Sequence, residues 1–193
     1  RLSIFVTKSL FFVRALDDAI LAGEIDCAVH SMKDIPAFRP SGLFTAAVLK
    51  RDSPADFLAC TGSKDTVRVI GTSSTRRRAQ LLRVNPEITI KDLRGNVYTS
   101  IIKMTLGEYD AIMLAEAGLT RLGISIKGKR FSPEKFVPAP NQGTIAVVSR
   151  ADPSLMEELS MLDHPQTRTD VAIERGAMEQ LGGGCFTPLG IYC

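Results

Sequence analysis

The chain has 193 residues, of which 45% are hydrophobic and 23% are charged. This composition is typical of a soluble globular protein with one or two domains and a substantial core. The net charge of +3 is too small to indicate general nucleic-acid binding, and no apolar run is long enough to cross a bilayer. We therefore expect neither a nucleic-acid partner nor a membrane partner.

The cysteines are Cys27, Cys60, Cys185 and Cys193, and they show neither CxxC spacing nor a dense framework. This usage favours a reduced, intracellular protein over a secreted protein stabilised by disulfides. No metal-ligand motif is present either, so we expect no bound metal.

The first third of the chain predicts a helix followed by strands. Apolar residues at helical spacing predict a helix over 10–21. Short apolar runs over 25–30, 43–49 and 57–60 are typical of buried strands. The polar segment 50–56, which contains a proline, is a candidate hinge or domain boundary.

Lys33 and Asp34 follow the first of these strands directly. Polar residues at the carboxyl end of a strand lie where open α/β sheets place their sites. A surface ion pair at a turn is the alternative interpretation of this pair. We interpret His30, at the end of the same strand, as a structural histidine with satisfied hydrogen bonds.

A short apolar strand over 67–70 leads into Gly71–Gln80, whose sequence is GTSSTRRRAQ. A glycine, then hydroxyls, then a helix start offers free backbone N–H groups and the positive end of a helix dipole. An ordinary helix cap with a solvated first turn would explain the hydroxyls. It would not explain the arginines, because positive charge in a first turn opposes the dipole. The segment therefore predicts an anion site.

The pattern of strand, polar turn and helix recurs through residues 67–123, with further strands predicted over 88–92 and 109–115. This rhythm is typical of a doubly wound α/β domain with parallel strands, whose carboxyl ends share one edge of the sheet. The arginines that follow successive strands are Arg76 and Arg77, then Arg94, then Arg121. Unrelated surface arginines are the alternative, but several on one edge predict a basic cleft for a ligand with more than one negative charge.

The last third begins with a second candidate hinge over 136–143, rich in proline and glycine. A strand predicted over 144–149 could return to the first domain, and helices are predicted over 154–162 and 167–181. Three glycines then precede Cys185. This arrangement indicates either an accessible thiol that anchors or attacks a ligand, or a helix end followed by a buried structural cysteine.

Six motifs together resemble the porphobilinogen deaminase family, also called hydroxymethylbilane synthase, over essentially the whole chain. They are HSMKDIP (30–36), GTSSTRRRAQL (71–81), DLRGNVYT (92–99), YDAIMLAEAGLTRLG (109–123), PAPNQG (138–143) and ERGAMEQLGGGC (174–185). The resemblance implies a transferase that joins four porphobilinogen molecules head to tail into hydroxymethylbilane, with loss of ammonia. It also implies a dipyrromethane cofactor joined by a thioether to one cysteine.

The resemblance implies a role for particular residues. The cofactor would be attached to Cys185, and Asp34 would be the catalytic aspartate that acts on the pyrrole N–H and on the cationic azafulvene-type intermediate. Lys8 and Phe11 fall in the family's mobile loop near the substrate. The acetate and propionate carboxylates would be held by Lys33, Thr72, Ser73, Ser74, Arg76, Arg77, Arg94 and Arg121.

The chain departs from the family pattern at several positions. Ser100 stands where a further ligand-binding arginine is usual, and the segment 9–13 carries one extra residue. Asn141 and Thr144 stand where glycine and alanine are commoner. The family's N-terminal strand and most of its third domain have no counterpart in these residues.

The resemblance predicts an α/β fold with two domains like those of periplasmic binding proteins, joined by a hinge, and the start of a small α+β third domain. Domain 1 would comprise 1–51 and 143–163, domain 2 would comprise 54–138, and 165–193 would begin domain 3. The family resemblance further implies a monomer in the cytoplasm, or in the plastid of a plant or alga.

Two other functions are consistent with an anion site. A solute-binding module for a carboxylate or phosphate would perform no chemistry, and it would need neither Cys185 nor Asp34. Nucleotide binding by the segment 72–78 is disfavoured because neither GxxxxGK[ST] nor GxGxxG is present.

Overall fold

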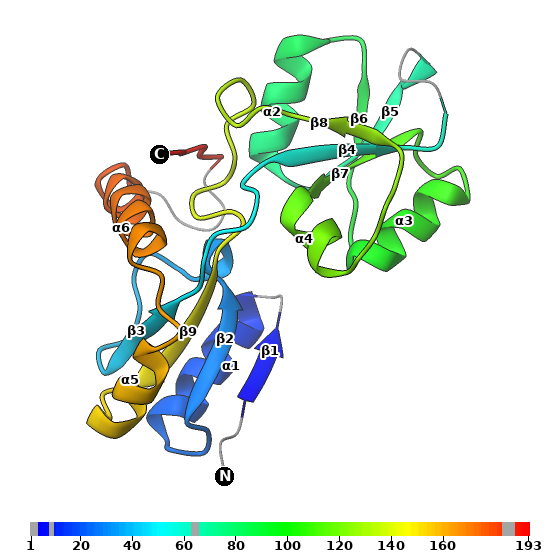
Figure 1. Cartoon of the computed structure of the whole chain (residues 1–193). Coiled ribbons are helices and arrows are strands. Elements are labelled where there is room, and N and C mark those ends of the chain that lie inside the picture. The colour runs from blue at the N-terminus through cyan, green and yellow to red at the C-terminus, as the bar shows by residue number, and fades with distance from the viewer. Residues whose placement is uncertain (1–3, 8–9, 63–65, 183–187) are drawn as a thin grey trace. The chain divides into compact units, whose positions relative to one another are not determined.

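The computed structural model describes residues 4–7, 10–62, 66–182 and 188–193, with side chains described from residue 13 onward (Figure 1). The chain divides into two compact units. Unit 1 is built from the described residues of Arg1–Asp52 and Pro140–Cys185, with Cys193. Unit 2 is built from those of Ser53–Ala139 and Phe186–Tyr192. Both units combine helices with a sheet, which confirms the expected α/β class, whereas the expected domain boundaries remain a prediction.

Unit 1 contains a sheet with the strand order β1-β2-β9-β3. Strand β1 pairs with β2 in parallel, and β9 runs antiparallel to both β2 and β3. The strand predicted over 144–149 is therefore central to this sheet, and β1 is a strand that we did not predict. The strands are β1 (Ile4–Thr7), β2 (Cys27–Ser31), β3 (Leu43–Val48) and β9 (Ile145–Arg150), and the helices are α1 (Leu10–Leu21), α5 (Pro153–Ser160) and α6 (Pro165–Gln180).

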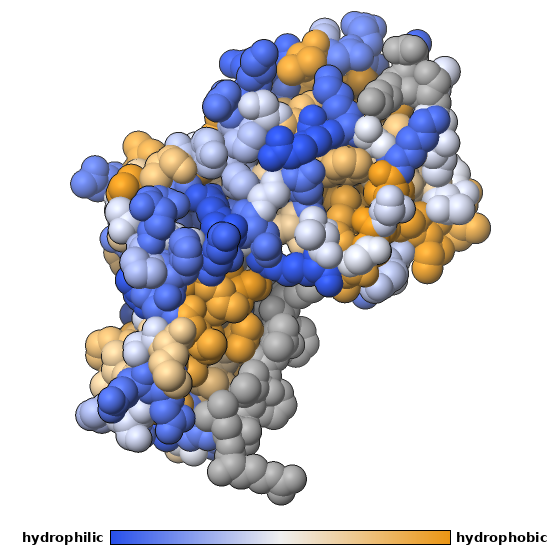
Figure 2. Space-filling view, in the orientation of Figure 1, coloured by the Kyte–Doolittle hydropathy of each residue, from blue (hydrophilic) through white to orange (hydrophobic). Residues whose placement is uncertain are grey.

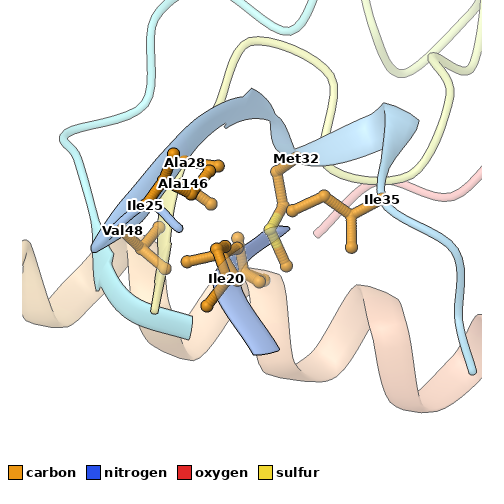
Figure 3. Packing of buried hydrophobic residues seen from close by; sticks show 9 residues of the cluster. Ile20, Ile25, Ala28, Met32, Ile35, Val48 and Ala146 are labelled. Atoms are coloured by element: carbon orange, nitrogen blue, oxygen red, sulfur yellow. The ribbon is translucent and has the colours of Figure 1, made fainter. Parts of the chain in front are cut away.

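The core of unit 1 fixes the short 3-10 turn η1 (Met32–Asp34) that follows β2. Met32 and Ile35, on either side of Lys33 and Asp34, are each 2% exposed. Figure 3 shows both side chains beside Ile20 of α1 in one apolar cluster. The turn that carries the two charged residues is thus held by its apolar neighbours.

Unit 2 contains a sheet with the strand order β6-β5-β7-β4-β8. Strand β5 pairs in parallel with β6 and with β7, as the sequence predicted, and β4 runs antiparallel to β7 and β8. Strand β8 was not predicted, because its three residues carry no apolar pattern. The strands are β4 (Asp56–Cys60), β5 (Val69–Gly71), β6 (Thr89–Lys91), β7 (Ala111–Ala115) and β8 (Gly128–Arg130), and the helices are α2 (Thr75–Val84), α3 (Val97–Thr105) and α4 (Glu116–Arg121).

Helices cover both faces of the unit 2 sheet, which explains why β7 is apolar at every position. Met113 of β7 packs in one core cluster with Leu81 of α2. Ile112, which points to the opposite face, packs in another cluster with Met104 of α3 and Leu119 of α4. A doubly covered sheet leaves the strand ends as the accessible edge.

Helix α3 turns only part of its surface toward the core. Ser100 and Met104 are buried, whereas Tyr98, Ile102 and Leu106, spaced four residues apart, are 53%, 56% and 74% exposed. Figure 2 shows apolar surface on the side of unit 2 where α3 lies. Ser100 is therefore on the inward face of this helix.

The two segments that flank Ser53–Ala139 of unit 2 are anchored in unit 1 by one buried carboxylate. Glu174 of α6 is completely buried and accepts from Arg51, at 2.7 Å from Nη1 and 3.3 Å from Nη2. It also accepts from the backbone N–H of Asn141, which is buried and left-handed with φ of 61°. Arg51 Nε in turn donates to the carbonyl of Gln142 at 3.0 Å. The segments before and after unit 2 thus meet at a single side chain.

Candidate functional site

The described residues of unit 2 form an open pocket of about 220 Å³ at the carboxyl ends of β5, β6 and β7. This is the edge where the sequence predicted a basic cleft. Its lining residues come from the segments that follow β5 and β6, from α2 and α3, and from β7. They are Thr72, Ser73, Ser74, Arg77, Leu93, Gly95, Ser100, Met113 and Leu114.

Three hydroxyls shape the segment between β5 and α2. Ser73 Oγ donates to the carbonyl of Leu93 at 2.8 Å and accepts from its amide at 3.0 Å, which ties the loops after β5 and β6 together. Thr72 Oγ1 accepts from the amide of Ser74 at 3.2 Å, and Ser74 Oγ accepts from the amide of Arg77 at 3.4 Å as the helix cap. The latter two hydroxyls act as acceptors here, and the described residues supply no acceptor for their hydrogens. Thr72 and Ser74 can therefore donate to an anion.

A glycine is required at one corner of this pocket. Gly95 has φ of +125°, and a Cβ atom there would lie 2.3 Å from Thr99 Oγ1. Any side chain would therefore be strained and would collide with the first turn of α3.

The three successive arginines of α2 have three different environments. Arg77 lines the pocket, Arg76 is 6% exposed and is absent from the lining, and Arg78 is exposed. Burial is the main cause of a lowered pKa at Arg76; Asp56 opposes the shift and Arg77 adds to it. The expectation that Arg76 and Arg77 both bind ligand carboxylates remains a prediction, but only Arg77 contributes to the pocket surface.

Asp56, the first residue of β4, is a member of the site that sequence reasoning missed. It is completely buried and forms ion pairs with Arg76 at 2.8 Å and with Arg77 at 2.6 Å. In the sequence it is the last residue of the polar segment 50–56, a candidate hinge. An acidic residue directly before an apolar strand was the available signal, but its partners follow it by twenty residues.

The other predicted carboxylate ligands of unit 2 differ in their distance from the pocket. Arg94 lies between two lining residues, is exposed, and within the described part of the chain its guanidinium forms no ion pair. Arg121 is the last residue of α4, so a short helix separates it from the end of β7. Ser100 lines the pocket and donates to the carbonyl of Asn96 at 2.7 Å. The departure from the family pattern at residue 100 therefore falls in the pocket itself.

Lys33 and Asp34 belong to unit 1, on the turn η1 at the carboxyl end of β2. Lys33 Nζ donates to Oε1 of the buried Gln142 at 3.3 Å, and the amide of Met32 donates to the carbonyl of Thr144 at 2.9 Å. The segment that returns from unit 2 thus supports this turn. Asp34 is half-buried there.

Three predicted site residues have no described side chain. Lys8 and Cys185 lie outside the described residues, and Phe11 is placed only as backbone in α1. The cysteines that are described, Cys27, Cys60 and Cys193, are free.

His30 is not the satisfied structural histidine that the sequence suggested. It is 1% exposed on β2, and neither ring nitrogen has a hydrogen-bond partner among the described side chains. Burial lowers its pKa below 6.5; the charge of Arg39 adds to this, while Asp17, the ion-pair partner of Arg39, opposes it. Burial therefore favours the neutral form of His30 in the folded state.

We expect this histidine to make the free energy of unfolding depend on pH. Because the pKa of His30 is lower in the folded chain, the unfolded chain binds more protons at this residue, so stability falls as the pH decreases from about 6.5 toward the lowered pKa. The slope from this one group is at most about 1.4 kcal/mol per pH unit in this window. Urea unfolding between pH 5 and 8 measures it. His30→Gln should remove the slope and His164→Gln, at the other histidine, should not; an unchanged slope in the first variant would exclude His30 as its origin.

None of the helices that the structure describes has the length and apolar character needed to span a bilayer. The described residues also contain no group of three or more His, Cys, Asp or Glu side chains arranged to hold a metal ion.

Comparison with known proteins identifies relatives over most of the chain. The family model described as porphobilinogen deaminase, dipyromethane cofactor binding domain, matches residues 2–158. A probable porphobilinogen deaminase of Methanosarcina acetivorans is 53% identical over 187 residues, which cover 94% of this chain and 59% of the relative. The porphobilinogen deaminase of Rubrobacter xylanophilus is 45% identical over 186 residues, which cover 93% and 61%. The chain thus spans about three fifths of the length of these curated relatives.

Solved structures with a similar arrangement of elements are more distant. The VFT2 domain of BvgS from Bordetella pertussis has a TM-score of 0.45 at 13% identity, with 87% of this chain and 72% of that chain covered. An ancestral cationic amino acid solute binding protein also has a TM-score of 0.45 at 13% identity, with 88% and 70% covered.

Proposed function

Because this chain belongs to the porphobilinogen deaminase family, we propose that it forms the part of such an enzyme that binds the growing pyrrole chain. This transferase joins four porphobilinogen molecules head to tail into hydroxymethylbilane and releases one ammonia for each unit, in the biosynthesis of haem and other tetrapyrroles. The observation that carries the proposal is the family match over residues 2–158, which includes the unit 2 pocket and the turn with Lys33 and Asp34.

The pocket has the chemistry that the acetate and propionate groups of a pyrrole require. Arg77 supplies a guanidinium, Thr72 and Ser74 can donate hydrogen bonds, and the first turn of α2 begins at the same place. A dipyrromethane primer on Cys185 would supply the free pyrrole carbon to which each unit is joined. The residues proposed to hold its carboxylates are Lys33, Thr72, Ser73, Ser74, Arg76, Arg77, Arg94 and Arg121.

Asp34 is the residue that we propose for catalysis. As ammonia leaves porphobilinogen, positive charge develops on the pyrrole and its methylene carbon, and a carboxylate nearby stabilises that charge. The same carboxylate can accept a hydrogen bond from the pyrrole N–H. Its position at the carboxyl end of β2 supports this role. Lys8 and Phe11 would contact the incoming substrate, and the enzyme would act as a cytoplasmic monomer.

The intact mass of the purified protein tests the proposal. Incubation with porphobilinogen should add the mass of two porphobilinogen molecules less two ammonia molecules. The first ammonia leaves as the C–S bond to Cys185 forms, and the second leaves as one C–C bond joins the second pyrrole to the first. Peptide mapping should place the added mass on Cys185. An unmodified Cys185 in a protein that still binds porphobilinogen would instead support the non-catalytic carboxylate-binding module.

We expect Arg77→Leu to weaken porphobilinogen binding and to block chain elongation, because it removes the guanidinium that lines the pocket. Charge-assisted hydrogen bonds contribute roughly 1.5–3 kcal/mol, which corresponds to about a tenfold to hundredfold loss of affinity. Calorimetric titration with porphobilinogen measures the effect. Arg78→Leu, at the exposed neighbouring position, is the matched control. Equal affinities for the two variants would count against the assignment of Arg77.

A further inference from the structure

Asp56 binds two arginines through separate carboxylate oxygens. Oδ1 accepts from Nη2 of Arg77 at 2.6 Å and from its Nε at 2.9 Å. Oδ2 lies 2.8 Å from Nη2 of Arg76. Because Asp56 is completely buried and begins β4, its position is fixed by the sheet. One rigid carboxylate therefore orients two neighbouring guanidiniums.

The two arginines use their remaining N–H groups differently. Arg76 Nη1 donates to the carbonyl of Val137 at 2.6 Å, and its guanidinium lies 6.0 Å from the ring centroid of Phe136. Arg77 Nη1 donates to the carbonyl of Met113, a lining residue, at 3.0 Å. Arg76 is thus embedded in the protein, while Arg77 lies at the pocket wall.

The cluster of Asp56, Arg76 and Arg77 contains more positive than negative charge. Two guanidiniums face one carboxylate, so the cluster keeps one positive charge in excess, and only Arg77 lies at the pocket. Without the carboxylate, two adjacent buried cations would repel each other, which is strongly unfavourable where water is excluded. Arg77 would then be free to take another rotamer.

We infer that Asp56 is a positioning residue of the carboxylate site, which holds the guanidinium of Arg77 at the pocket and employs Arg76 as its buried counter-charge. The inference rests on the proposed function, since it assumes that the pocket binds a ligand carboxylate. The excess of one positive charge suits one carboxylate group at this wall of the pocket.

A double variant tests the inference without changing the net charge of the cluster. Asp56→Asn alone leaves two buried guanidiniums with no counter-ion, and the variant can fail to fold. Asp56→Leu combined with Arg76→Gln removes one charge of each sign, keeps the net charge of the cluster, and leaves no oxygen at residue 56 to accept from Arg77. Glutamine can still donate to the carbonyl of Val137. We expect the double variant to fold and to leave Arg77 without its anchor.

Two measurements test separately whether Asp56 fixes the guanidinium of Arg77 and whether it affects porphobilinogen binding. In the native protein, the Nε–Hε group of Arg77 should give a protected, slowly exchanging NMR resonance, because it is bonded to Asp56. The double variant should lose this protection and bind porphobilinogen at least about tenfold more weakly. Asp110→Asn is the matched control, since Asp110 accepts from the backbone amides of Arg68 and Val69, at the opposite end of β7. It should bind as the native protein does.

The outcomes distinguish the inference from the proposed function. A double variant that keeps the protected Arg77 resonance, or that binds porphobilinogen as tightly as the native protein, overturns the role of Asp56. If the native protein shows the resonance but binds no porphobilinogen, the proposed ligand is wrong. The resonance in the double variant then decides the positioning role by itself.

Discussion

Asp34→Asn is expected to stop the formation of hydroxymethylbilane and to leave the fold unchanged. Asparagine is nearly isosteric with aspartate but cannot balance the positive charge that develops as ammonia leaves, so turnover should fall by about a hundredfold or more. The fold should persist because Met32 and Ile35 hold the turn in the core. Absorbance of the porphyrin formed from the product by acid and oxidation measures turnover, and circular dichroism measures the fold.

Asp18→Asn provides the control for this experiment, because Asp18 is an exposed aspartate on α1 of the same unit. Its turnover should match that of the native protein. Near-normal turnover in the Asp34→Asn variant would refute the catalytic role of Asp34. Loss of turnover in both variants would show that the assay responds to any aspartate substitution in this unit and not to the loss of Asp34 itself.

Glu174→Gln is expected to cause the largest loss of stability in unit 1. The neutral amide removes the carboxylate charge that pairs with Arg51 at 2.7 Å, in a site where the side chains of Arg51 and Glu174 are 10% and 0% exposed. Breaking a buried ion pair by neutralising one partner costs about 3–5 kcal/mol. The amide group would also place N–H donors toward the amide of Asn141, which needs an acceptor. Urea unfolding of the purified protein measures the change in the free energy of unfolding.

A glutamate-to-glutamine substitution at an exposed ion pair provides the comparison for this loss in the free energy of unfolding. Glu116 pairs with Arg130 at 2.7 Å, but their side chains are 21% and 52% exposed, so Glu116→Gln should cost no more than about 1 kcal/mol. A double variant with Arg51→Met and Glu174→Gln should recover part of the loss, since the unpaired cation is gone. Equal costs at the buried and exposed pairs would show that burial does not determine the effect.

The apolar patterns of the sequence predicted the helices and strands that bury a continuous apolar face. The apolar spacing of residues 10–21 gave the bounds of α1, and the recurring strand, turn and helix of unit 2 predicted that β5, β6 and β7 are parallel. The pocket lies where those strands end. Periodicity succeeds here because each of these elements buries a continuous apolar face.

Contacts between residues far apart in the chain could not be predicted from the sequence. The arginine run indicated an anion site, but nothing near Arg76 indicated that Asp56 would occupy its guanidinium. The pairing of β4 with β7, which brings Asp56 to Arg77, joins residues far apart in the chain. Neither ring nitrogen of His30 has a hydrogen-bond partner among the described residues. The sequence could not predict this either, because the hydrogen bonds of a buried side chain depend on its tertiary neighbours.

The position of β9 between β2 and β3 has a consequence for biosynthesis on the ribosome. When Val48 emerges, β3 has no strand to pair with, since its partner begins at Ile145. The segment Ser53–Ala139 that forms the body of unit 2 is continuous, and it can fold as soon as it leaves the exit tunnel. Unit 1 therefore has to keep β3 unpaired until the inserted unit has been made, and nascent chains halted before residue 145 should engage chaperones through this apolar strand.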